Sequence, residues 1–217
     1  MKRIIALLTT AVMLLAFAGC GANSTQSQAE TETKAAASTK VSEATKAADE
    51  TKAESNDTES SSKTLVVYFS ATGTTKGVAE QIASALNADT YEITAAQPYT
   101  SDDLNYSDSN SRTTKEQNDK TVRPEIGSEK TNLDGYDTIF IGFPIWWGEE
   151  PRIMDTFVES YDFSGKTMIP FCTSGGSGIG SSGDNLKANA GSGEWKDGAR
   201  LSGSDVQDWL DGLNLKE

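Results

Sequence analysis

The sequence predicts an α/β domain with three layers, in which a parallel β-sheet lies between two layers of helices. Apolar segments with strand character alternate along the chain with segments of helical spacing, which is the order of a parallel sheet. The best-marked strands are apolar throughout instead of alternating, so both faces of the sheet are expected to be covered by helices. Residues 63–217 are long enough to bury a substantial core.

The first elements follow one another closely. A run of apolar and aromatic residues predicts a buried strand over Leu65–Ser70. Apolar residues then recur at helical spacing over Thr75–Asn87, and the alternation in Thr90–Thr94 indicates a second strand. The long stretch Gln97–Val122 is polar, with one short helix expected over Arg112–Asp119.

The next four elements repeat the same order. Tyr136–Phe143 and Lys166–Thr173 are both continuous apolar runs, which predict buried strands. A helix over Arg152–Glu159 separates them, and a weaker helical pattern follows over Ser182–Asn189. The domain therefore continues as strand, helix, strand, helix.

The last strand and helix are marked unequally. A strand over Ala199–Ser202 is only weakly indicated. The closing helix, Asp205–Leu213, carries Val206, Trp209 and Leu210 on one apolar stripe. Ser204 directly precedes this helix and is expected to cap it.

The first twenty residues have the pattern of a bacterial export signal. Lys2 and Arg3 precede the apolar run Ile4–Phe17, and two small residues then precede Cys20. This pattern resembles the lipobox of bacterial lipoproteins, which implies a signal peptide over residues 1–19 and lipidation of Cys20. The protein is then expected outside the cytoplasm, anchored to the cell membrane. An ordinary secretory signal with an incidental Cys20 is the alternative.

The segment that follows, residues 20–62, has the composition of a disordered linker. After Cys20 it contains no aromatic residue and, apart from alanine, only Val41 as an apolar side chain. Its Thr-Lys pairs recur every six residues, a period that matches neither a helix nor a strand. Such a segment cannot bury enough apolar surface to offset its ordering entropy. It is expected to tether residues 63–217 to the membrane, and a partner-binding repeat is the alternative.

Composition excludes several classes of function. The chain contains no histidine, which rules out Ser-His or Cys-His catalysis and a histidine metal site. Residues 63–217 hold thirteen Lys and Arg against twenty-four Asp and Glu, which argues against nucleic-acid binding. No catalytic side chain and no metal site is expected. Cys172 has no free partner once Cys20 is lipidated, and is interpreted as a packed core thiol.

A hydroxyl-rich loop follows the first strand and leads directly into a helix. Ser70–Thr75 contains four hydroxyl side chains and Gly73. Backbone N–H groups and the helix dipole meet at such a point, which favours an anion, most often a phosphate. The loop has neither G-x-x-x-x-G-K-[ST] nor G-x-G-x-x-G, so a monophosphate fits better than a triphosphate or a dinucleotide. Lys76 either assists this site or is simply solvated, and a plain turn is the alternative for the loop.

Two further loops follow the next strands, and all three should open at one edge of the sheet. In Pro144–Gly148 we expect both Trp146 and Trp147 to be exposed, which favours stacking with a flat ring. The alternative is that one of them caps the core. In Thr173–Gly178 the glycines would let the backbone approach such a ring, and a flexible connector is the alternative.

The three loops together resemble those of a known family. Ser70–Thr75 resembles the phosphate-binding S/T-x-T-G-x-T loop of flavodoxins, and Gly142–Gly148 and Pro170–Gly178 resemble the two loops that flank the isoalloxazine in a flavodoxin-like subgroup. The resemblance implies a flavodoxin-like sandwich, with a five-stranded sheet of order 2-1-3-4-5 and one noncovalent FMN. It also implies a phosphate site at Ser70, Thr72, Gly73, Thr74 and Thr75, and a ring site at Pro144, Ile145, Trp146, Trp147, Gly148, Thr173, Ser174, Gly175 and Gly176. The glycine-rich stretch Ala190–Arg200 departs from the family pattern, so the sequence does not clearly predict the fifth strand.

The leading hypothesis for function is an electron carrier that uses FMN and exchanges electrons with an unidentified redox protein or small acceptor. Glu149, Glu150 and the negative charge of the domain should lower its last reduction potential. A backbone carbonyl near Gly148 is expected to accept a hydrogen bond from the reduced ring. An FMN-dependent oxidoreductase acting between NAD(P)H and a quinone, and a binding module without flavin, are the alternatives.

Overall fold

The computed structural model describes residues 63–213 and 215. The expected signal peptide, Cys20 and linker therefore lie outside the described residues. The described elements, in chain order, are β1 (Thr64–Phe69), α1 (Thr74–Leu86), β2 (Asp89–Ile93), α2 (Arg112–Asn118), β3 (Thr138–Pro144), α3 (Arg152–Glu159), β4 (Thr167–Thr173), α4 (Ser182–Ala190), β5 (Glu194–Trp195), β6 (Ala199–Arg200) and α5 (Val206–Gly212).

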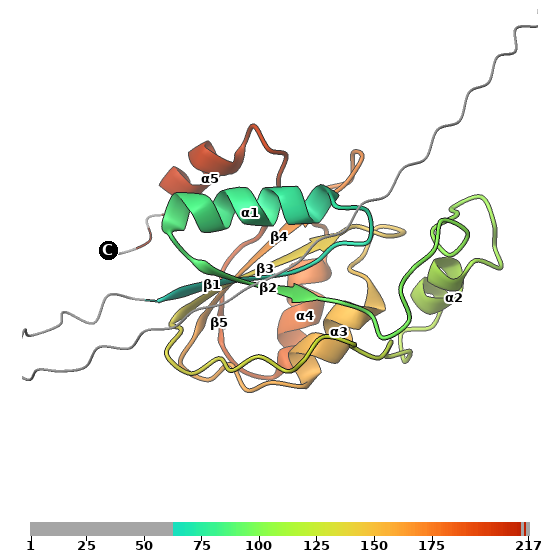
Figure 1. Cartoon of the computed structure of the whole chain (residues 1–217), viewed down its shortest axis with the longest axis horizontal. Helices are drawn as coiled ribbons and strands as arrows, with labels where there is room; N and C mark the ends of the chain where they lie inside the picture. The colour runs from blue at the N-terminus through green and yellow to red at the C-terminus, as the bar shows by residue number, and fades with distance from the viewer. Residues whose placement is uncertain (1–62, 214, 216–217) are drawn as a thin grey trace, which may run out of the picture. The chain divides into compact units, whose positions relative to one another are not determined.

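The sheet has the expected topology. Its order is β2-β1-β3-β4-β5, β6 also pairs with β4, and every pairing between these strands is parallel. Helices α1 and α5 cover one face, and α3 and α4 cover the other (Figure 1). The predicted three-layer α/β sandwich of order 2-1-3-4-5 is thus confirmed.

Strand β1 supplies both cores of the domain because its side chains alternate between the two faces. Leu65, Val67 and Phe69 belong to the core beneath α3 and α4. Val66 and Tyr68 belong to the core beneath α1 and α5. All five side chains are buried, which explains why this strand is apolar throughout.

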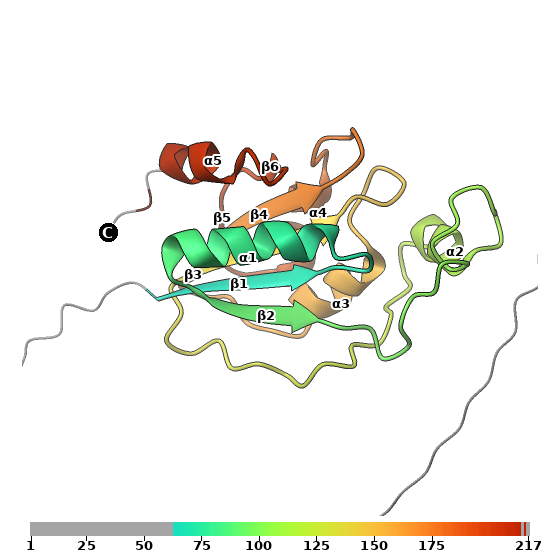
Figure 2. The ribbon, with the colours of Figure 1, turned by 45° about the horizontal axis from the view of Figure 1, so that its top comes forward.

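The parallel register brings the ends of the central strands to one edge. Val67 of β1 pairs with Ile141 of β3, which in turn pairs with Pro170 of β4. The three predicted loops leave the sheet at the carboxyl ends of these strands. Helix α2 also lies beyond this edge, away from both helical layers (Figure 2). In sheets of this order, ligands bind where the strand order changes direction, next to β1 and β3.

The outermost strand consists of two short pieces, and the predicted strand Ala199–Ser202 covers only the second. Glu194 N–H donates to Lys166 O at 2.8 Å, and Leu201 N–H donates to Cys172 O at 2.8 Å. Lys196 N–H also donates to Met168 O at 2.9 Å, so Pro170 is the β4 residue between the bonded carbonyls of Met168 and Cys172. The Pro170 carbonyl faces Gly198, and proline has no N–H to donate. The ladder is therefore interrupted at Pro170, and β5 and β6 are separate.

The start of α5 also differs from the prediction. The helix begins at Val206 with Asp205 as its N-cap residue, and no side chain caps it. The Ser204 hydroxyl instead donates to the Asp205 carboxylate at 3.0 Å, while that carboxylate accepts the Ser202 N–H at 3.3 Å. The Ser204 hydroxyl and the Asp205 carboxylate are thus engaged in this local turn instead of capping the first N–H groups of α5. Among the described helices, none is long and apolar enough to cross a membrane.

Candidate functional site

The loop after β1 forms an open helix N-terminus. Gly73 is the N-cap of α1 with φ of 87°, a left-handed conformation that glycine adopts at little cost. Its N–H donates to the Ser70 hydroxyl at 3.1 Å, which fixes the turn. No side chain caps α1, and its first turn contains no acidic residue. The first N–H groups of this helix are thus directed at an anion-binding position.

The hydroxyls of this loop divide into two groups. The Thr72 and Thr74 hydroxyls lie 3.4 Å apart at the exposed surface of the turn. The Thr75 hydroxyl is buried and lies 2.8 Å from the hydroxyl of Thr173, at the end of β4. The Thr173 carbonyl also accepts the Ile145 N–H at 2.9 Å. Thr173 therefore joins all three predicted loops at one edge of the sheet.

The loop after β3 contains a tight hairpin, Trp146–Glu149, which we call the ring-side hairpin. Trp146 N–H donates to Glu149 O at 2.9 Å, and Glu149 N–H donates to Trp146 O at 3.1 Å. Both central residues have positive φ, 49° at Trp147 and 85° at Gly148, as a type I′ turn requires. This conformation is common for glycine and strained for tryptophan.

The two indoles of the hairpin differ in their surroundings, and the prediction that both are exposed is wrong. Trp146 is buried, with its ring edge-to-face against Phe69 at 5.6 Å and Tyr99 at 5.1 Å between centroids. Trp147 is 38% exposed, and its ring lies 4.4 Å from that of Tyr106. Trp146 thus caps the core, as the alternative held, and Trp147 is the indole that offers an open surface.

The loop after β4 is organised around one hydroxyl. The Ser174 hydroxyl donates to the Ser177 carbonyl and accepts the Gly176 N–H at 3.3 Å. A Cβ at Gly175 or Gly176 would meet nothing within 4 Å, so the space beside this backbone is open. A Cβ added at Gly180, further along the chain, would lie 3.5 Å from the Gly148 carbonyl oxygen, so this segment approaches the ring-side hairpin.

The two acidic residues at the end of the hairpin, Glu149 and Glu150, are bound by cations. Glu149 contacts Arg152 at 2.5 Å and Lys120 at 2.9 Å, and these two hydrogen bonds lower its pKa. Glu150 is buried, contacts Arg152 at 3.4 Å and accepts from the Asn185 amide; desolvation raises its pKa. The expected local negative charge is therefore partly compensated by Arg152 and Lys120.

Lys76 has a partner that neither sequence interpretation considered. Its ammonium lies 2.9 Å from the carboxylate of Glu92, which also accepts the Tyr68 hydroxyl at 3.2 Å. This hydrogen bond raises the pKa of Lys76. The anion position at α1 is consequently built from neutral donors, the backbone N–H groups and hydroxyls, as the sequence of the loop indicated.

Three residues near the hairpin were missed because they come from the polar stretch before β3. They are Tyr99, Tyr106 and Gln117. Tyr99 packs on Trp146, Tyr106 packs on Trp147, and Gln117 donates to the Trp146 carbonyl at 2.7 Å. Two tyrosines in an otherwise polar segment were the available signal, because aromatic side chains there need a surface to pack against.

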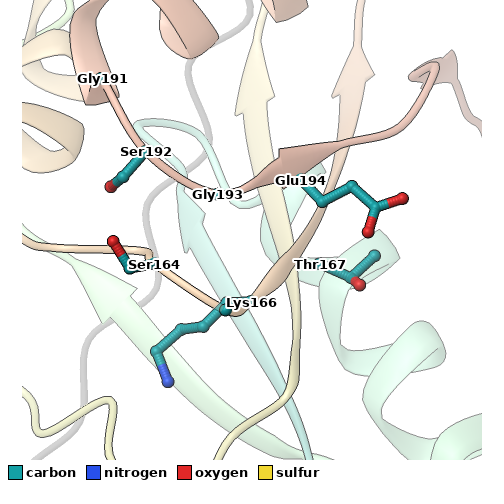
Figure 3. A pocket seen from close by; sticks show the side chains of 8 residues that line it. Ser164, Lys166, Thr167, Gly191, Ser192, Gly193 and Glu194 are labelled. Atoms are coloured by element: carbon teal, nitrogen blue, oxygen red, sulfur yellow. The ribbon is translucent and has the colours of Figure 1, made fainter.

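Cavities lie at both edges of the sheet. One of about 200 Å³ borders Ser70 and Tyr99 at the carboxyl edge. Another, of about 490 Å³, lies at the amino ends of β4 and β5, where Lys166 extends away from Gly193 and Glu194 (Figure 3). The Lys166 ammonium there donates to the Leu133 carbonyl at 2.8 Å, so it serves the fold. Of these two cavities, only the first is lined by a predicted loop, the one after β1.

Within the described residues, neither Cys172 nor the acidic side chains form a reactive-thiol or metal centre. Cys172 is a free, fully buried thiol, and burial raises its pKa to about 12, as expected for a core thiol. Within residues 63–213, no group of three or more Cys, Asp or Glu side chains has the arrangement of a metal site.

The fold and the loops define an α/β protein with an uncapped helix N-terminus and an aromatic hairpin beside the strand-order switch. The chain belongs to the flavodoxin family, whose family model, described as "Flavodoxin", matches residues 63–213.

Solved structures agree with this assignment. A protein from Bacteroides eggerthii DSM 20697, described as a candidate flavoprotein, is 47% identical over 72% of this chain and 100% of its own, with a TM-score of 0.67. A similar protein from Bacteroides uniformis ATCC 8492 is 47% identical over 69% of this chain and 98% of its own, with a TM-score of 0.65. A flavoprotein in complex with FMN from Lactobacillus acidophilus NCFM is 25% identical over 69% and 99%, with a TM-score of 0.56.

Proposed function

We propose that residues 63–217 bind FMN at the carboxyl edge of the sheet and act as an electron carrier. When bound, FMN supplies the redox chemistry, and the protein contributes binding, orientation and electrostatics. The observation that carries the proposal is the meeting of the three loops at Thr173, next to the uncapped start of α1. The FMN complex of the Lactobacillus acidophilus relative supports the choice of this flavin.

The phosphate half of the site fits a monophosphate. The first N–H groups of α1 and the exposed hydroxyls of Thr72 and Thr74 are neutral donors on one turn. Gly73 leaves this turn open, because a Cβ there would meet nothing within 4 Å. Ser70 and Thr75 contribute by fixing the turn, through the Gly73 N–H and the Thr173 hydroxyl.

The ring half of the site fits a flat aromatic group. Trp147 offers an exposed indole, and Ile145 and Trp146 hold the hairpin in the core. Pro144, which is half-buried, ends β3 just before them. On the other side, Gly175 and Gly176 provide an open backbone. The Ser174 hydroxyl accepts the Gly176 N–H, and the buried Thr173 joins this loop to Thr75. We assign the Gly148 peptide as a hydrogen-bonding group toward the ring, because Gly148 is the residue of the turn that changes conformation at least cost.

An electron carrier is favoured over an enzyme by the surroundings of the hairpin. Proton-transferring side chains are needed in most substrate pockets, yet the chain contains no histidine. The two carboxylates closest to the hairpin in sequence, Glu149 and Glu150, are bound by Arg152. Over the whole domain, carboxylates still outnumber cations. This excess disfavours the negative charge that reduction adds to a bound flavin, so it lowers the reduction potential of the flavin.

We further propose that the domain is held at the outer face of the cell membrane. The support is the lipobox-like sequence that ends at Cys20, followed by the polar linker through residue 62. Replacing Cys20 with alanine should move the protein from the membrane fraction to the soluble fraction. Retention of the Cys20→Ala chain in washed membranes would contradict the lipid anchor.

Flavin titration tests the binding site. Adding FMN to the purified full-length chain should quench flavin fluorescence, and Thr72→Ala combined with Thr74→Ala should weaken FMN binding about tenfold or more. Riboflavin lacks the phosphate, so its affinity should change little in the double variant. An equal loss for both ligands would refute the phosphate assignment.

Reduction experiments distinguish the carrier from its alternatives. Photoreduction of the bound flavin, followed by visible spectra, should resolve two separate one-electron steps in a carrier. Steady NADH oxidation with a quinone would instead indicate an FMN-dependent oxidoreductase. A colourless protein that takes up no FMN would indicate a binding module without flavin.

A further inference from the structure

Gln117 connects α2 to the ring-side hairpin. Its side-chain nitrogen Nε2 donates to the Trp146 carbonyl at 2.7 Å and to the Glu150 carbonyl at 3.1 Å. A primary amide has two N–H donors, so both are used by these bonds. Trp146 begins the hairpin and Glu150 directly follows it. The Gln117 amide thus bridges the hairpin across its base.

The bridge lies in a buried environment. Gln117 is 9% exposed, Trp146 is 4% exposed and Glu150 is 1% exposed. Hydrogen bonds that are shielded from water are costly to lose, because water cannot replace the missing donor. The hairpin therefore depends on Gln117 more than an exposed loop would depend on a surface side chain.

The hairpin needs such support because its conformation is strained. Trp147 has φ of 49°, which a residue with a Cβ rarely adopts. Strained backbone persists only where the surrounding structure fixes it. The two backbone bonds between Trp146 and Glu149 close the turn, and Gln117 holds the chain on both sides of it.

The same part of the chain also holds the side chains around the hairpin. The Tyr99 ring packs on Trp146, and the Tyr99 hydroxyl donates to Glu116, the residue before Gln117, at 2.8 Å. Arg152 donates to the Gln117 carbonyl at 3.4 Å and contacts the Glu149 carboxylate at 2.5 Å. Main-chain and side-chain contacts of the hairpin thus converge on α2.

We propose that Gln117 is a positioning residue for the flavin ring: its amide holds the ring-side hairpin in the conformation that receives the ring. This inference rests on the proposed FMN site. Within the described residues, the Gln117 side chain donates to the carbonyls of Trp146 and Glu150, and neither residue belongs to the phosphate loop. Its replacement should therefore weaken the binding of FMN and of riboflavin by the same factor.

Gln117→Met tests the proposal, because methionine has similar length and helix propensity and no amide donor. Asn118→Met is the matched control, since it removes an exposed amide from the same helix. Both variants are made in the full-length chain and titrated with FMN and with riboflavin. In Gln117→Met we expect both dissociation constants to rise about tenfold and the separation of the two midpoint potentials to change. Asn118→Met should match the wild type.

Hydrogen exchange provides a readout that needs no flavin. The Glu149 N–H, which donates to Trp146 O, should exchange faster in Gln117→Met than in the wild type or in Asn118→Met. Gln117→Glu serves as a second variant: it keeps the size of the side chain and places an acceptor against two carbonyl oxygens, so it should act in the same direction. Far-ultraviolet circular dichroism confirms that each variant is folded.

Each result decides between clear alternatives. Wild-type flavin affinity together with wild-type exchange in folded Gln117→Met would overturn the proposal. A larger loss for FMN than for riboflavin would also overturn it, because Gln117 would then act on the phosphate half. If the wild-type chain binds neither flavin, the proposed function fails, and unchanged exchange at Glu149 would still overturn the role of Gln117 in the hairpin.

Discussion

Gly142 lies directly beneath the ring of Phe171, its partner in the register of β3 and β4. A Cβ at Gly142 would lie 2.2 Å from Cζ of that ring, and Phe171 is fully buried. We expect Gly142→Ala to lower the free energy of unfolding by about 1–3 kcal/mol through overpacking. Urea unfolding measures this difference.

Gly77 provides a matched control for this substitution. It lies inside α1, where a Cβ would meet nothing within 4 Å. Gly77→Ala should raise the free energy of unfolding by about 0.5–1 kcal/mol, because alanine loses less backbone entropy in a helix. A loss of stability similar to that of Gly142→Ala would contradict the steric explanation.

Glu150 is a buried carboxylate that shares Arg152 with Asp155, and its environment predicts a pH dependence of stability. Burial raises the pKa of Glu150 above its ordinary 4.5, so the folded protein holds this proton more tightly than the unfolded chain. Its contribution to stability is present below that ordinary value and is lost as the pH rises through the folded pKa. Each unit of difference in pKa corresponds to about 1.4 kcal/mol.

Glu150→Gln should therefore become more stable relative to the wild type as the pH rises above about 4.5. The glutamine oxygen still accepts from Asn185, and the glutamine amide can donate to the neighbouring Ser182 hydroxyl. Urea unfolding at several pH values between about pH 4 and pH 8 measures the difference. A difference that stays constant across this range would show that Glu150 does not titrate differently in the folded state.

The sequence predicted some site residues well and others poorly, for physical reasons. The turn at Ser70–Thr75 is local, so its residue types were sufficient to predict a helix N-terminus with neutral donors. Trp146 and Trp147 are neighbours in sequence, and nothing local distinguishes them. Their difference arises from Tyr99 and Tyr106, which approach from a distant segment.

At the scale of elements, the edge formed by β5 and β6 should be the least stable part of the sheet. Each piece has two residues, and Pro170 of β4 interrupts the ladder between them. Strand β3, in contrast, is paired along both sides. Amide hydrogen exchange should therefore be faster by orders of magnitude at Lys196 and Leu201, which donate to β4, than in the middle of β3. Equal protection would indicate that this edge unfolds only together with the whole domain.

The predicted elements succeeded where burial is complete on both faces. Strands β1, β3 and β4 are apolar throughout, so their composition alone was sufficient. Strand β5 was missed because a two-residue pairing leaves no periodicity to detect. Pro170 could have predicted the break between β5 and β6, because a proline in a paired strand removes one N–H donor from the hydrogen-bond ladder.

At the scale of the whole molecule, the proposed site exists only in the folded domain. Ser70–Thr75, Pro144–Gly148 and Thr173–Gly176 are far apart in sequence and are joined through Thr173 by the parallel sheet. A ligand that binds only the folded state stabilises it by about 2.7 kcal/mol when its free concentration is a hundred times its dissociation constant. For a domain of this size, that corresponds to a rise in Tm of about 5–10 °C.

We therefore expect FMN to raise the Tm of the full-length chain, and riboflavin at the same concentration to raise it less, since it lacks the phosphate held at α1. The Thr72→Ala and Thr74→Ala double variant should lose most of the difference between the two ligands, because it removes exposed donors from the phosphate half. Differential scanning calorimetry measures all four combinations. An unchanged Tm at FMN concentrations that saturate fluorescence quenching would contradict binding at these converging loops, because binding there must favour the folded state.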